Sequence, residues 1–386
     1  MTARFRLSLR LSLYYAALYS VIGVQLPYWP LYLASKGLDA AQIGQILAAT
    51  YLVKIISNPL LGHAADRYGG RRRWLIAIAI LSLATTGLFA YSHDFVSVLL
   101  VTLLSSAAFT PMLPLGDNLT LQNTIRHRLD YGRIRLWGSI SFIAVASIAG
   151  LGLVDAPRPA ILWSCLAGLI VTSGATFQLP EPRVRVEKDE PKPIAALFRS
   201  RTFLLFLAAN SLNQVSHMIY YGFATLNWHA AGLSGTAIGC FWGEGVVAEV
   251  MMFLFGAKLV ERFGPGVMMA SGGIAGAIRW TVLGATVAPL PLAIAQLLHA
   301  FTFAAAHLGA MHFIIRAVPP SLSARAQGIY SAVTTGVVPG IAMLASGRLY
   351  QTLGGHAFLV MSVFSVASWL VALRLSRNWN GGPILE

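Results

Sequence analysis

Several ionisable side chains of this chain lie inside long apolar stretches, where a charge is unfavourable. Asp117 is the one carboxylate of "PMLPLGDNLTL" (111–121), and almost every residue before it back to Val96 is apolar or small. On membrane-insertion scales such a group costs at least about 2.5–3.5 kcal/mol, so it marks a polar partner, a wet cavity or a function. Asp117 is therefore the first candidate for a functional residue.

Arg135 is the cation that we expect Asp117 to meet. Asp117 lies nine residues before Arg126, which is about 13 Å along a helix, and Arg135 begins the next run, which returns in the opposite direction. A guanidinium group is long, planar and suited to a carboxylate. We predict that the two side chains meet across a water-filled cavity, with a purely structural ion pair as the alternative.

Three further titratable residues fall near one level on three successive apolar runs. Glu249 and Arg279 each lie 13 residues, or about 20 Å, from the same end of their runs, and His299 lies ten residues, or about 15 Å, from the opposite end. A carboxylate binds its proton more weakly beside Arg and more tightly when desolvated. A motion that separates Glu249 from Arg279 would therefore load or release a proton. A static salt bridge with a packing histidine is the alternative.

Other polar and aromatic side chains are candidates for the wall of a cavity. Lys54 is the lone cation of its run, about 18 Å from Asp66, and either snorkels to the surface or attracts an anionic ligand. The aromatic candidates are His217, Tyr220 and Tyr221 in one run and Tyr28 and Trp29 in another. The alternative for these rings is an aromatic belt at the membrane interface.

The elements that carry these residues predict an all-α membrane protein. Hydrophobic residues make up 56% of the 386 residues and charged residues only 11%, against about 25% charged residues in soluble domains. Each apolar run has about 20 residues, enough to cross a hydrocarbon core of about 30 Å as a helix. We predict twelve transmembrane helices, at 8–33, 40–64, 74–92, 96–122, 135–154, 159–179, 202–229, 236–260, 266–287, 289–315, 325–346 and 355–375.

The placement of the net charge of +14 indicates a membrane protein rather than a nucleic-acid-binding protein. Most of the 28 Lys and Arg residues lie in the tails and loops of one side, and the other side keeps Lys36, Arg158 and Arg348. The positive-inside rule then places both termini in the cytoplasm, as in a bacterial inner-membrane protein. The excess charge sets the orientation and attracts the lipid surface, so we expect no nucleic-acid partner.

A polar, Pro-rich stretch divides the runs into two sets of six. It predicts a bundle at 1–180, a cytoplasmic linker at 181–201 and a second bundle at 202–386. A weak repeat supports the division, since "GHAADRYGGRRR" (62–73) and "GAKLVERFGPG" (256–266) each follow the second run of their half. Parallel six-helix repeats are typical of transporters that bind substrate between the halves near mid-membrane.

The first of these repeated loops is a candidate gate. Its glycines permit a tight turn, and its carboxylate can interact with a helix end or an Arg. The predicted gating residues are Gly62, Asp66, Arg67, Gly69 and Arg71. A plain topology marker is the alternative.

The same loop resembles the signature between helices two and three of the major facilitator superfamily. Other stretches resemble one branch, the phenylpropionic acid transporter family, with lactose permease as a more distant relative. They are "LPYWPLYL" (26–33), "LDYGRIRLWGS" (129–139), "YYGF" (220–223), "GVVAEV" (245–250), "RW" (279–280) and "LHAFTFAAAHLGAM" (298–311). The resemblance implies the major facilitator fold and proton-coupled symport of a small aromatic carboxylate such as a phenylpropionate.

The resemblance also implies roles for particular residues. An acid in helix four and an Arg in helix five recognise the sugar in lactose permease, which implies substrate contact for Asp117 and Arg135. Lactose permease has a Glu three residues after the helix-ten His, where this chain has Thr302. If protons are coupled here, another carboxylate must carry them, and we predict Glu249.

Other functions remain open at this point. A sugar or oligosaccharide symporter is favoured by Asp117 as an acceptor for hydroxyl groups, and a drug/proton antiporter would have fewer paired charges. A membrane enzyme is disfavoured because the HExxH motif, the nucleophile elbow and the P-loop are missing. We expect no cofactor and no metal, and the expected partners of a monomeric protein are the substrate, the proton and the lipid bilayer.

Overall fold

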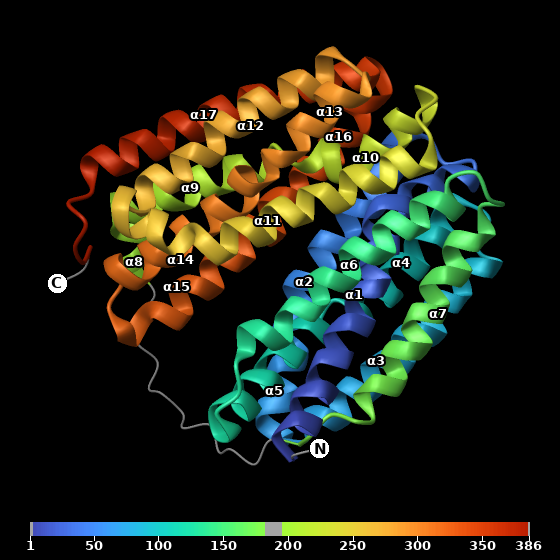
Figure 1. Cartoon of the computed structure of the whole chain (residues 1–386), viewed down its shortest axis with the longest axis horizontal. Helices are drawn as coiled ribbons and strands as arrows, with labels where there is room; N and C mark the ends of the chain where they lie inside the picture. The colour runs from blue at the N-terminus through green and yellow to red at the C-terminus, as the bar shows by residue number, and fades with distance from the viewer. Residues whose placement is uncertain (1–2, 182–194, 385–386) are drawn as a thin grey trace. The chain divides into compact units, whose positions relative to one another are not determined.

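The computed structural model describes residues 3–181 and 195–384, and within these ranges its regular structure is helical, with no strand (Figure 1). The predicted all-α class is confirmed. Most of the predicted linker at 181–201 lies outside the described residues. The chain divides into two compact units, the first comprising residues 1–188 and 234–243 and the second residues 189–233 and 244–386.

The first unit is built from the helices coloured blue to green in Figure 1. Its helices are α1 (Ala3–Ser35), α2 (Ala40–Tyr68), α3 (Arg71–Gly87), η1 (Leu88–Tyr91), α4 (Phe95–Phe109), α5 (Met112–His127), α6 (Tyr131–Leu153) and α7 (Pro159–Thr176). Within it, α1 packs along α6 and α7, and α3 packs along α4 and α7.

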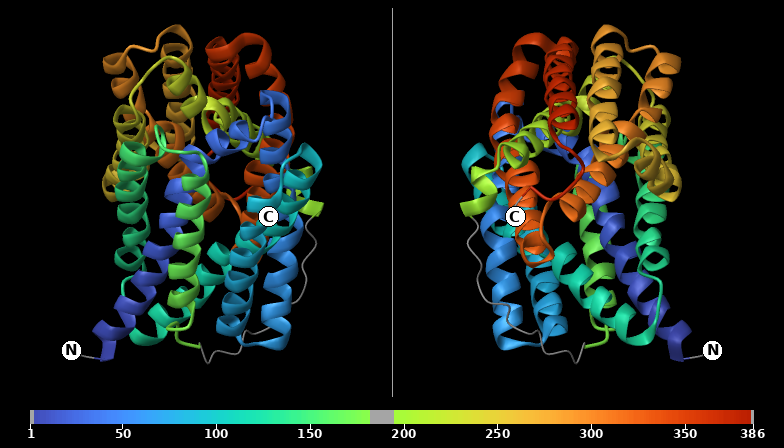
Figure 2. Two further views of the ribbon diagram at one scale, coloured as in Figure 1. Left: turned by 90° about the vertical axis from the view of Figure 1, so that its right-hand side faces the viewer. Right: turned by 90° about the vertical axis from the view of Figure 1, so that its left-hand side faces the viewer.

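The second unit holds the helices of the other half. They are α8 (Ala195–Arg199), α9 (Arg201–Val215), α10 (Met218–Ala230), α12 (Pro265–Ala285), α13 (Pro289–Leu297), η2 (Ala300–Ala305), α14 (Ala306–Ala317), α15 (Pro320–Ala332), η3 (Val333–Val337), α16 (Val338–Leu353), η4 (Gly354–His356) and α17 (Ala357–Asn378). The long helix α11 (Gly235–Phe263) begins in the first unit and continues in the second. The two views of Figure 2 show the long helices of each unit running alongside one another.

Helix starts and turns follow from local sequence. Asp39 caps α2, because its carboxylate accepts from the backbone N–H of Gln42 while Gln42 Oε1 accepts from the backbone N–H of Asp39. The two repeated loops both turn on a glycine with positive φ, Gly69 at +66° and Gly264 at +79°. A side chain is strained at such angles, so the repeat seen in the sequence is a repeated turn.

The twelve predicted spans fall into fewer continuous helical runs. Ten helical runs of the described residues are long and apolar enough to cross a membrane. The predicted spans at 325–346 and 355–375 fall in one run, Arg325–Asn378. The predicted span at 202–229 is broken into α9 and α10 at Ser216 and His217, so each part is shorter than a membrane crossing.

Three other predicted helices are also interrupted, and in the predicted 325–346 helix the π-helical segment η3 separates α15 from α16. The predicted 96–122 helix breaks between α4 and α5 at Pro111, which has no backbone N–H to continue the ladder. The predicted 289–315 helix contains the π-helical segment η2 directly after His299. Such segments are rare in helices and frequent at functional sites.

Glycines on one face of α12 allow α17 to lie against it. A Cβ added at Gly273 would lie 2.6 Å from the backbone N of Trp369, and one at Gly276 would lie 2.6 Å from the Ser365 hydroxyl. Small residues let helices in membranes approach closely and gain van der Waals contact. The pairing of α12 with α17 therefore depends on these glycines. It fixes the position of α12, which carries Arg279.

We expect Gly273→Ala to destabilise the protein, because the added methyl group meets backbone atoms of α17 that cannot rotate away. Overpacking of this kind costs about 1–3 kcal/mol, and it would lower the thermal midpoint of the purified protein in detergent. The matched control is Gly174→Ala on α7, where no atom lies within 4 Å of the added Cβ. Equal midpoints for the two variants would contradict the close packing.

Candidate functional site

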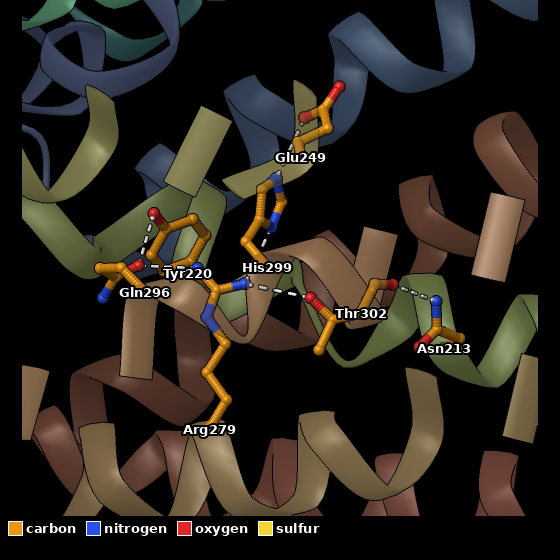
Figure 3. Close-up of polar contacts among 7 residues, drawn as sticks. All are labelled: Asn213, Tyr220, Glu249, Arg279, Gln296, His299 and Thr302. Atoms are coloured by element: carbon orange, nitrogen blue, oxygen red, sulfur yellow. Dashed lines mark hydrogen bonds and ion pairs between the residues drawn. The ribbon is translucent and has the colours of Figure 1, made fainter. Parts of the chain in front are cut away.

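A network of polar side chains centres on Arg279 in the interior of the second unit (Figure 3). Arg279 lies on α12 and is fully buried. Its guanidinium group donates to Gln296 Oε1 at 2.7 Å and to Thr302 Oγ1 at 3.2 Å, and it contacts His299 Nδ1 at 2.9 Å. Three neighbours from α13 and the following segment thus hold one cation.

His299 connects this cation to a carboxylate. An Arg side chain can only donate, so Nδ1 of His299 must accept and the proton of the neutral ring lies on Nε2. Nε2 faces Glu249 Oε2 of α11 at 3.4 Å (Figure 3). The three predicted residues Glu249, His299 and Arg279 are therefore brought together in one chain of contacts.

The order of that chain differs from the prediction. We predicted that Glu249 and Arg279 would interact directly, whereas His299 lies between them in the structure. Among the described residues, no carboxylate contacts the Arg279 guanidinium group. Burial of a cation without a paired anion is unfavourable unless hydrogen bonds and rings compensate for it.

Aromatic rings supply part of this compensation. The guanidinium carbon of Arg279 lies 4.5 Å from the ring centre of Tyr220 and 4.6 Å from that of Trp280. The negative faces of such rings attract a cation. The Tyr220 hydroxyl donates to Gln296 Oε1 at 3.1 Å, so Tyr220 belongs to the network through both its ring and its hydroxyl.

His217 extends the network toward α10. Its Nδ1 contacts the backbone oxygen of Asn213 at 2.8 Å, and its ring packs against Tyr221, Trp280 and His299. A carbonyl can only accept, so Nδ1 carries the proton and Nε2 is an acceptor. The structure thus brings the predicted residues His217, Tyr220 and Tyr221 to the same cluster as Arg279.

Several polar atoms in this cluster are buried without a partner in the described part of the chain. They are Asn213 Oδ1, His217 Nε2, Arg279 Nε and Gln296 Nε2. Nearly all buried polar groups in proteins are hydrogen-bonded to protein or to ordered water. Two donors and two acceptors in one cluster are therefore suited to water molecules or to a polar ligand.

The π-helical segment η2 gives Thr302 two roles. Its hydroxyl accepts from Arg279, and its backbone oxygen accepts from Asn213 Nδ2 at 2.8 Å (Figure 3). A π turn disturbs the regular ladder of backbone bonds and re-aims the side chains around it. Thr302 is thus a partner of Arg279 through its hydroxyl and of Asn213 through its backbone oxygen.

The first unit places Asp117 among tyrosines. Asp117 Oδ1 accepts from the Tyr15 hydroxyl of α1 at 2.6 Å and from the Tyr131 hydroxyl of α6 at 3.0 Å. Arg135 instead donates to the Tyr19 hydroxyl and lies 4.2 Å over the Tyr19 ring and 5.4 Å over the Tyr15 ring. Asp117 and Arg135 thus share Tyr15 as a neighbour.

The direct contact that we predicted between Asp117 and Arg135 is absent, since neither forms an ion pair in the described residues. Two tyrosine hydroxyls donate to Oδ1 of the carboxylate instead, and a flat ring can lie between a cation and an anion. Asp117 of α5 and Arg135 of α6 are therefore linked only indirectly, through Tyr15.

The other predicted residues of the first unit lie elsewhere. Lys54 on α2 is half-buried with Nζ 4.6 Å from the centre of the Tyr51 ring. The Tyr28 hydroxyl donates to the backbone oxygen of Ala146 at 2.6 Å, and Trp29 stacks on Tyr32 at 4.7 Å. Tyr28 and Trp29 are about 20 Å along α1 from Tyr15, so the structure does not bring them to Asp117.

The predicted gating loop is compact. Asp66 forms an ion pair with the buried Arg71 across the turn at Gly69, and the guanidinium carbon of Arg67 lies 5.5 Å from the Tyr68 ring centre. Gly62 lies earlier on α2, with no atom within 4 Å of an added Cβ. The carboxylate and guanidinium group thus close the α2–α3 turn.

Comparison with known proteins agrees with this architecture. A family model described as the MFS_1 like family matches residues 8–361. The chain belongs to this family. The predicted resemblance and the major facilitator fold are confirmed, and the protein is a multi-pass membrane transporter of major facilitator type.

Several relatives of this major facilitator chain are named. The "Probable 3-phenylpropionic acid transporter" of Escherichia coli (strain K12) is 33% identical over 365 residues, which cover 92% of this chain and 94% of that protein. The "Maltose permease" of Geobacillus stearothermophilus is 25% identical over 377 residues, covering 95% of this chain and 94% of the relative. The crystal structure of nucleoside transporter NupG covers 96% of this chain and 98% of its own, with a TM-score of 0.83 at 18% identity, which shows the fold alone.

Sequence reasoning missed four residues that this major facilitator chain uses to hold its charges. They are Tyr15, Tyr19, Tyr131 and Gln296. Gln296 lies three residues before His299, the helical spacing that brings two side chains to one face, so it could have been found. The tyrosines carry no charge and come from distant helices, so no pattern in the sequence singled them out.

Proposed function

We propose that this transporter is a proton-coupled symporter of a small aromatic carboxylate of the 3-phenylpropionate kind, working by alternating access. The observation that carries the proposal is the chain Glu249–His299–Arg279, in which a carboxylate reaches a fully buried guanidinium group through one imidazole ring. The name of the 33% identical relative supports the substrate class.

Charge balance links the proton to the anion in this proposal. While Glu249 is ionised, it is the negative group that offsets Arg279 through His299. A proton on Glu249 removes that negative charge, and an anionic substrate restores it. The proton then raises the affinity for the anion, and by linkage the anion raises the affinity for the proton.

The substrate has suitable partners in both units. The cations Arg135 and Lys54 would attract its carboxylate, and aromatic rings would pack against its own ring. The proposed substrate-binding residues are Lys54, Asp117, Arg135, His217, Tyr220 and Tyr221, with Tyr28 and Trp29 farther along α1. Glu249, Arg279 and His299 would couple the proton.

The remaining parts of the proposal concern motion and location. The bundles at 1–180 and 202–386 would rock, with the Asp66–Arg71 ion pair breaking and re-forming as the gate. The one-sided Lys and Arg distribution supports cytoplasmic termini, and the bacterial relatives support a bacterial inner membrane. We propose a monomer as the working unit.

Uptake into proteoliposomes tests this function. We expect labelled 3-phenylpropionate to accumulate when the outside is made acidic, and a protonophore to abolish the accumulation. Unchanged uptake with and without the pH step would reject proton coupling.

A sugar remains the second candidate substrate, because Asp117 accepts two hydroxyl hydrogen bonds in the structure, as it would from a sugar. The relative named as a maltose permease also supports it. The uptake assay therefore includes maltose and a nucleoside beside the aromatic acid. Accumulation of maltose or the nucleoside, with none of the aromatic acid, would reject the carboxylate assignment.

A further inference from the structure

Asn213 on α9 contacts two helices at points where their regular structure is interrupted. Its side-chain Nδ2 donates to the backbone oxygen of Thr302 inside the π-helical segment η2, at 2.8 Å (Figure 3). Its own backbone oxygen accepts from Ser216 Oγ at 2.7 Å and faces His217 Nδ1 at 2.8 Å, where α9 breaks from α10. One buried residue thus joins both interruptions.

Stability alone does not explain an amide at this position. A carbonyl oxygen can only accept, so Nδ2 of Asn213 is the atom that faces Thr302, and Oδ1 points elsewhere. Oδ1 is buried and has no hydrogen-bond partner within residues 3–181 and 195–384. A buried acceptor without a partner is unfavourable, and an apolar side chain of similar shape would avoid it. The feature that only the amide supplies is the hydrogen bond to Thr302.

Thr302 transmits this contact to Arg279. The Thr302 hydroxyl, at 3.2 Å, and His299 Nδ1, at 2.9 Å, both bond to the same atom of Arg279, Nη1. This nitrogen of a guanidinium group carries two hydrogens, so each neighbour takes one of them. The Thr302 hydroxyl therefore fixes the direction of the other hydrogen, which points at His299 Nδ1.

The protonation of His299 depends on that direction. Glu249 from α11, Arg279 from α12 and His217 from α10 face this ring. While Nη1 of Arg279 donates to Nδ1, the lone pair of Nδ1 is occupied and the single ring proton lies on Nε2, toward Glu249 at 3.4 Å. If Nη1 turns away, Nδ1 becomes free to bind a second proton.

We propose that Asn213 is a positioning residue for proton coupling, which acts by holding Thr302 against Arg279. The ring of His299 then stays neutral, and an incoming proton binds at the Glu249 carboxylate instead. This assignment rests on the proposed proton-coupled function, because it concerns which side chain carries the proton.

Nitrogen NMR of isotopically labelled histidine, with the protein in nanodiscs, measures this protonation without any substrate. At about pH 6 we expect a neutral His299 ring in the natural protein, assigned by the loss of its signal in His299→Gln. In Asn213→Leu we expect a doubly protonated ring at the same pH, because Nη1 no longer blocks Nδ1. His217 is an internal reference, since its Nδ1 bonds to a backbone oxygen that the substitution keeps.

Asn210→Leu is the matched control. Asn210 lies one turn earlier on α9 and is equally buried, at 4% exposed against 5% for Asn213. Its amide donates to the backbone oxygen of Phe206 at 2.8 Å and contacts Met269 Sδ at 3.2 Å, outside the polar network. We expect both variants to have a lower thermal midpoint, and the control to keep a neutral His299 ring and the natural rate of uptake.

Uptake of 3-phenylpropionate under a pH step measures the effect on coupling. For Asn213→Leu we expect an initial rate about tenfold lower, the value of one hydrogen bond to a charged group. Thr302→Val keeps the backbone oxygen and the side-chain shape, and should cause the same loss. The double variant should lose no more than either single variant, because the two residues act along one route. An additive loss would overturn the proposal.

Thr302→Val also decides the matter if Asn213→Leu does not fold. It removes only the hydroxyl, so a natural His299 signal in this variant would contradict the proposed route. A ring that stays neutral in Asn213→Leu, or one that is charged in the natural protein, would also reject the role of Asn213 while leaving proton-coupled transport in place. Absence of uptake by the natural protein would instead reject the proposed function.

Discussion

We expect Arg279→Lys to abolish uphill transport, with the initial rate of uptake falling on the order of 100-fold. The guanidinium fork reaches Gln296, His299 and Thr302 at once, and a compact ammonium group cannot hold all three. Two lost hydrogen bonds to a charged group, at about 1.5 kcal/mol each, correspond to about a 100-fold change. The measurement is pH-driven uptake of 3-phenylpropionate into proteoliposomes.

The matched control for this prediction is Arg316→Lys, an exposed position at the end of α14. We expect its uptake to equal that of the natural protein. A second readout, the thermal midpoint, separates lost function from lost folding, because removal of a partner from a buried charged network also destabilises it. Natural uptake by a well-folded Arg279→Lys protein would show that charge alone is needed, and that the fork geometry is not.

Glu249→Gln should uncouple transport from the proton gradient while leaving exchange intact. A Gln side chain can still accept the hydrogen bond that His299 Nε2 offers, but it cannot take up a proton. The accumulation ratio under an imposed pH step is then expected to fall to about one, because carriage without a proton cannot exceed equilibrium. Counterflow of labelled against unlabelled substrate should continue, and the two assays use the same proteoliposomes.

Glu244→Gln is the matched control, since Glu244 lies on the same helix five residues earlier. It lines a groove of about 650 Å³ whose other lining residues are apolar, including Val247, Met251 and Leu297. We expect this variant to accumulate substrate as the natural protein does. Normal accumulation by Glu249→Gln together with uncoupling by Glu244→Gln would mean that the proton carrier is Glu244.

The helices and their turns were predictable because they depend on local chemistry. Uniform apolar runs separated by charged loops predicted membrane helices, and the glycines at positive φ, Gly69 and Gly264, ended two of them where the repeat indicated. The breaks inside runs were harder. Pro111 is visible in the sequence as a helix breaker, whereas the π segment after His299 has no proline and depends on tertiary contacts.

The depth of each candidate residue along its helix was predictable from the sequence. The rise of a helix is fixed at 1.5 Å per residue, so counting residues brought Glu249, Arg279 and His299 to one depth, and the structure joins them. The same count predicted that Asp117 meets Arg135. In the structure the hydroxyls of Tyr15 on α1 and Tyr131 on α6 bind the Asp117 carboxylate instead.

For this chain the sequence by itself determined the all-α class, the family resemblance and the depth of each buried charge. Only the tertiary structure decided which atoms meet, such as His299 between Glu249 and Arg279. The physical reason is rotation about the helix axis. Successive residues of an α-helix turn by about 100°, and in a run that is apolar on every side no polar stripe marks the inward face. That rotation is set by packing between helices, as in the glycine face that binds α12 to α17.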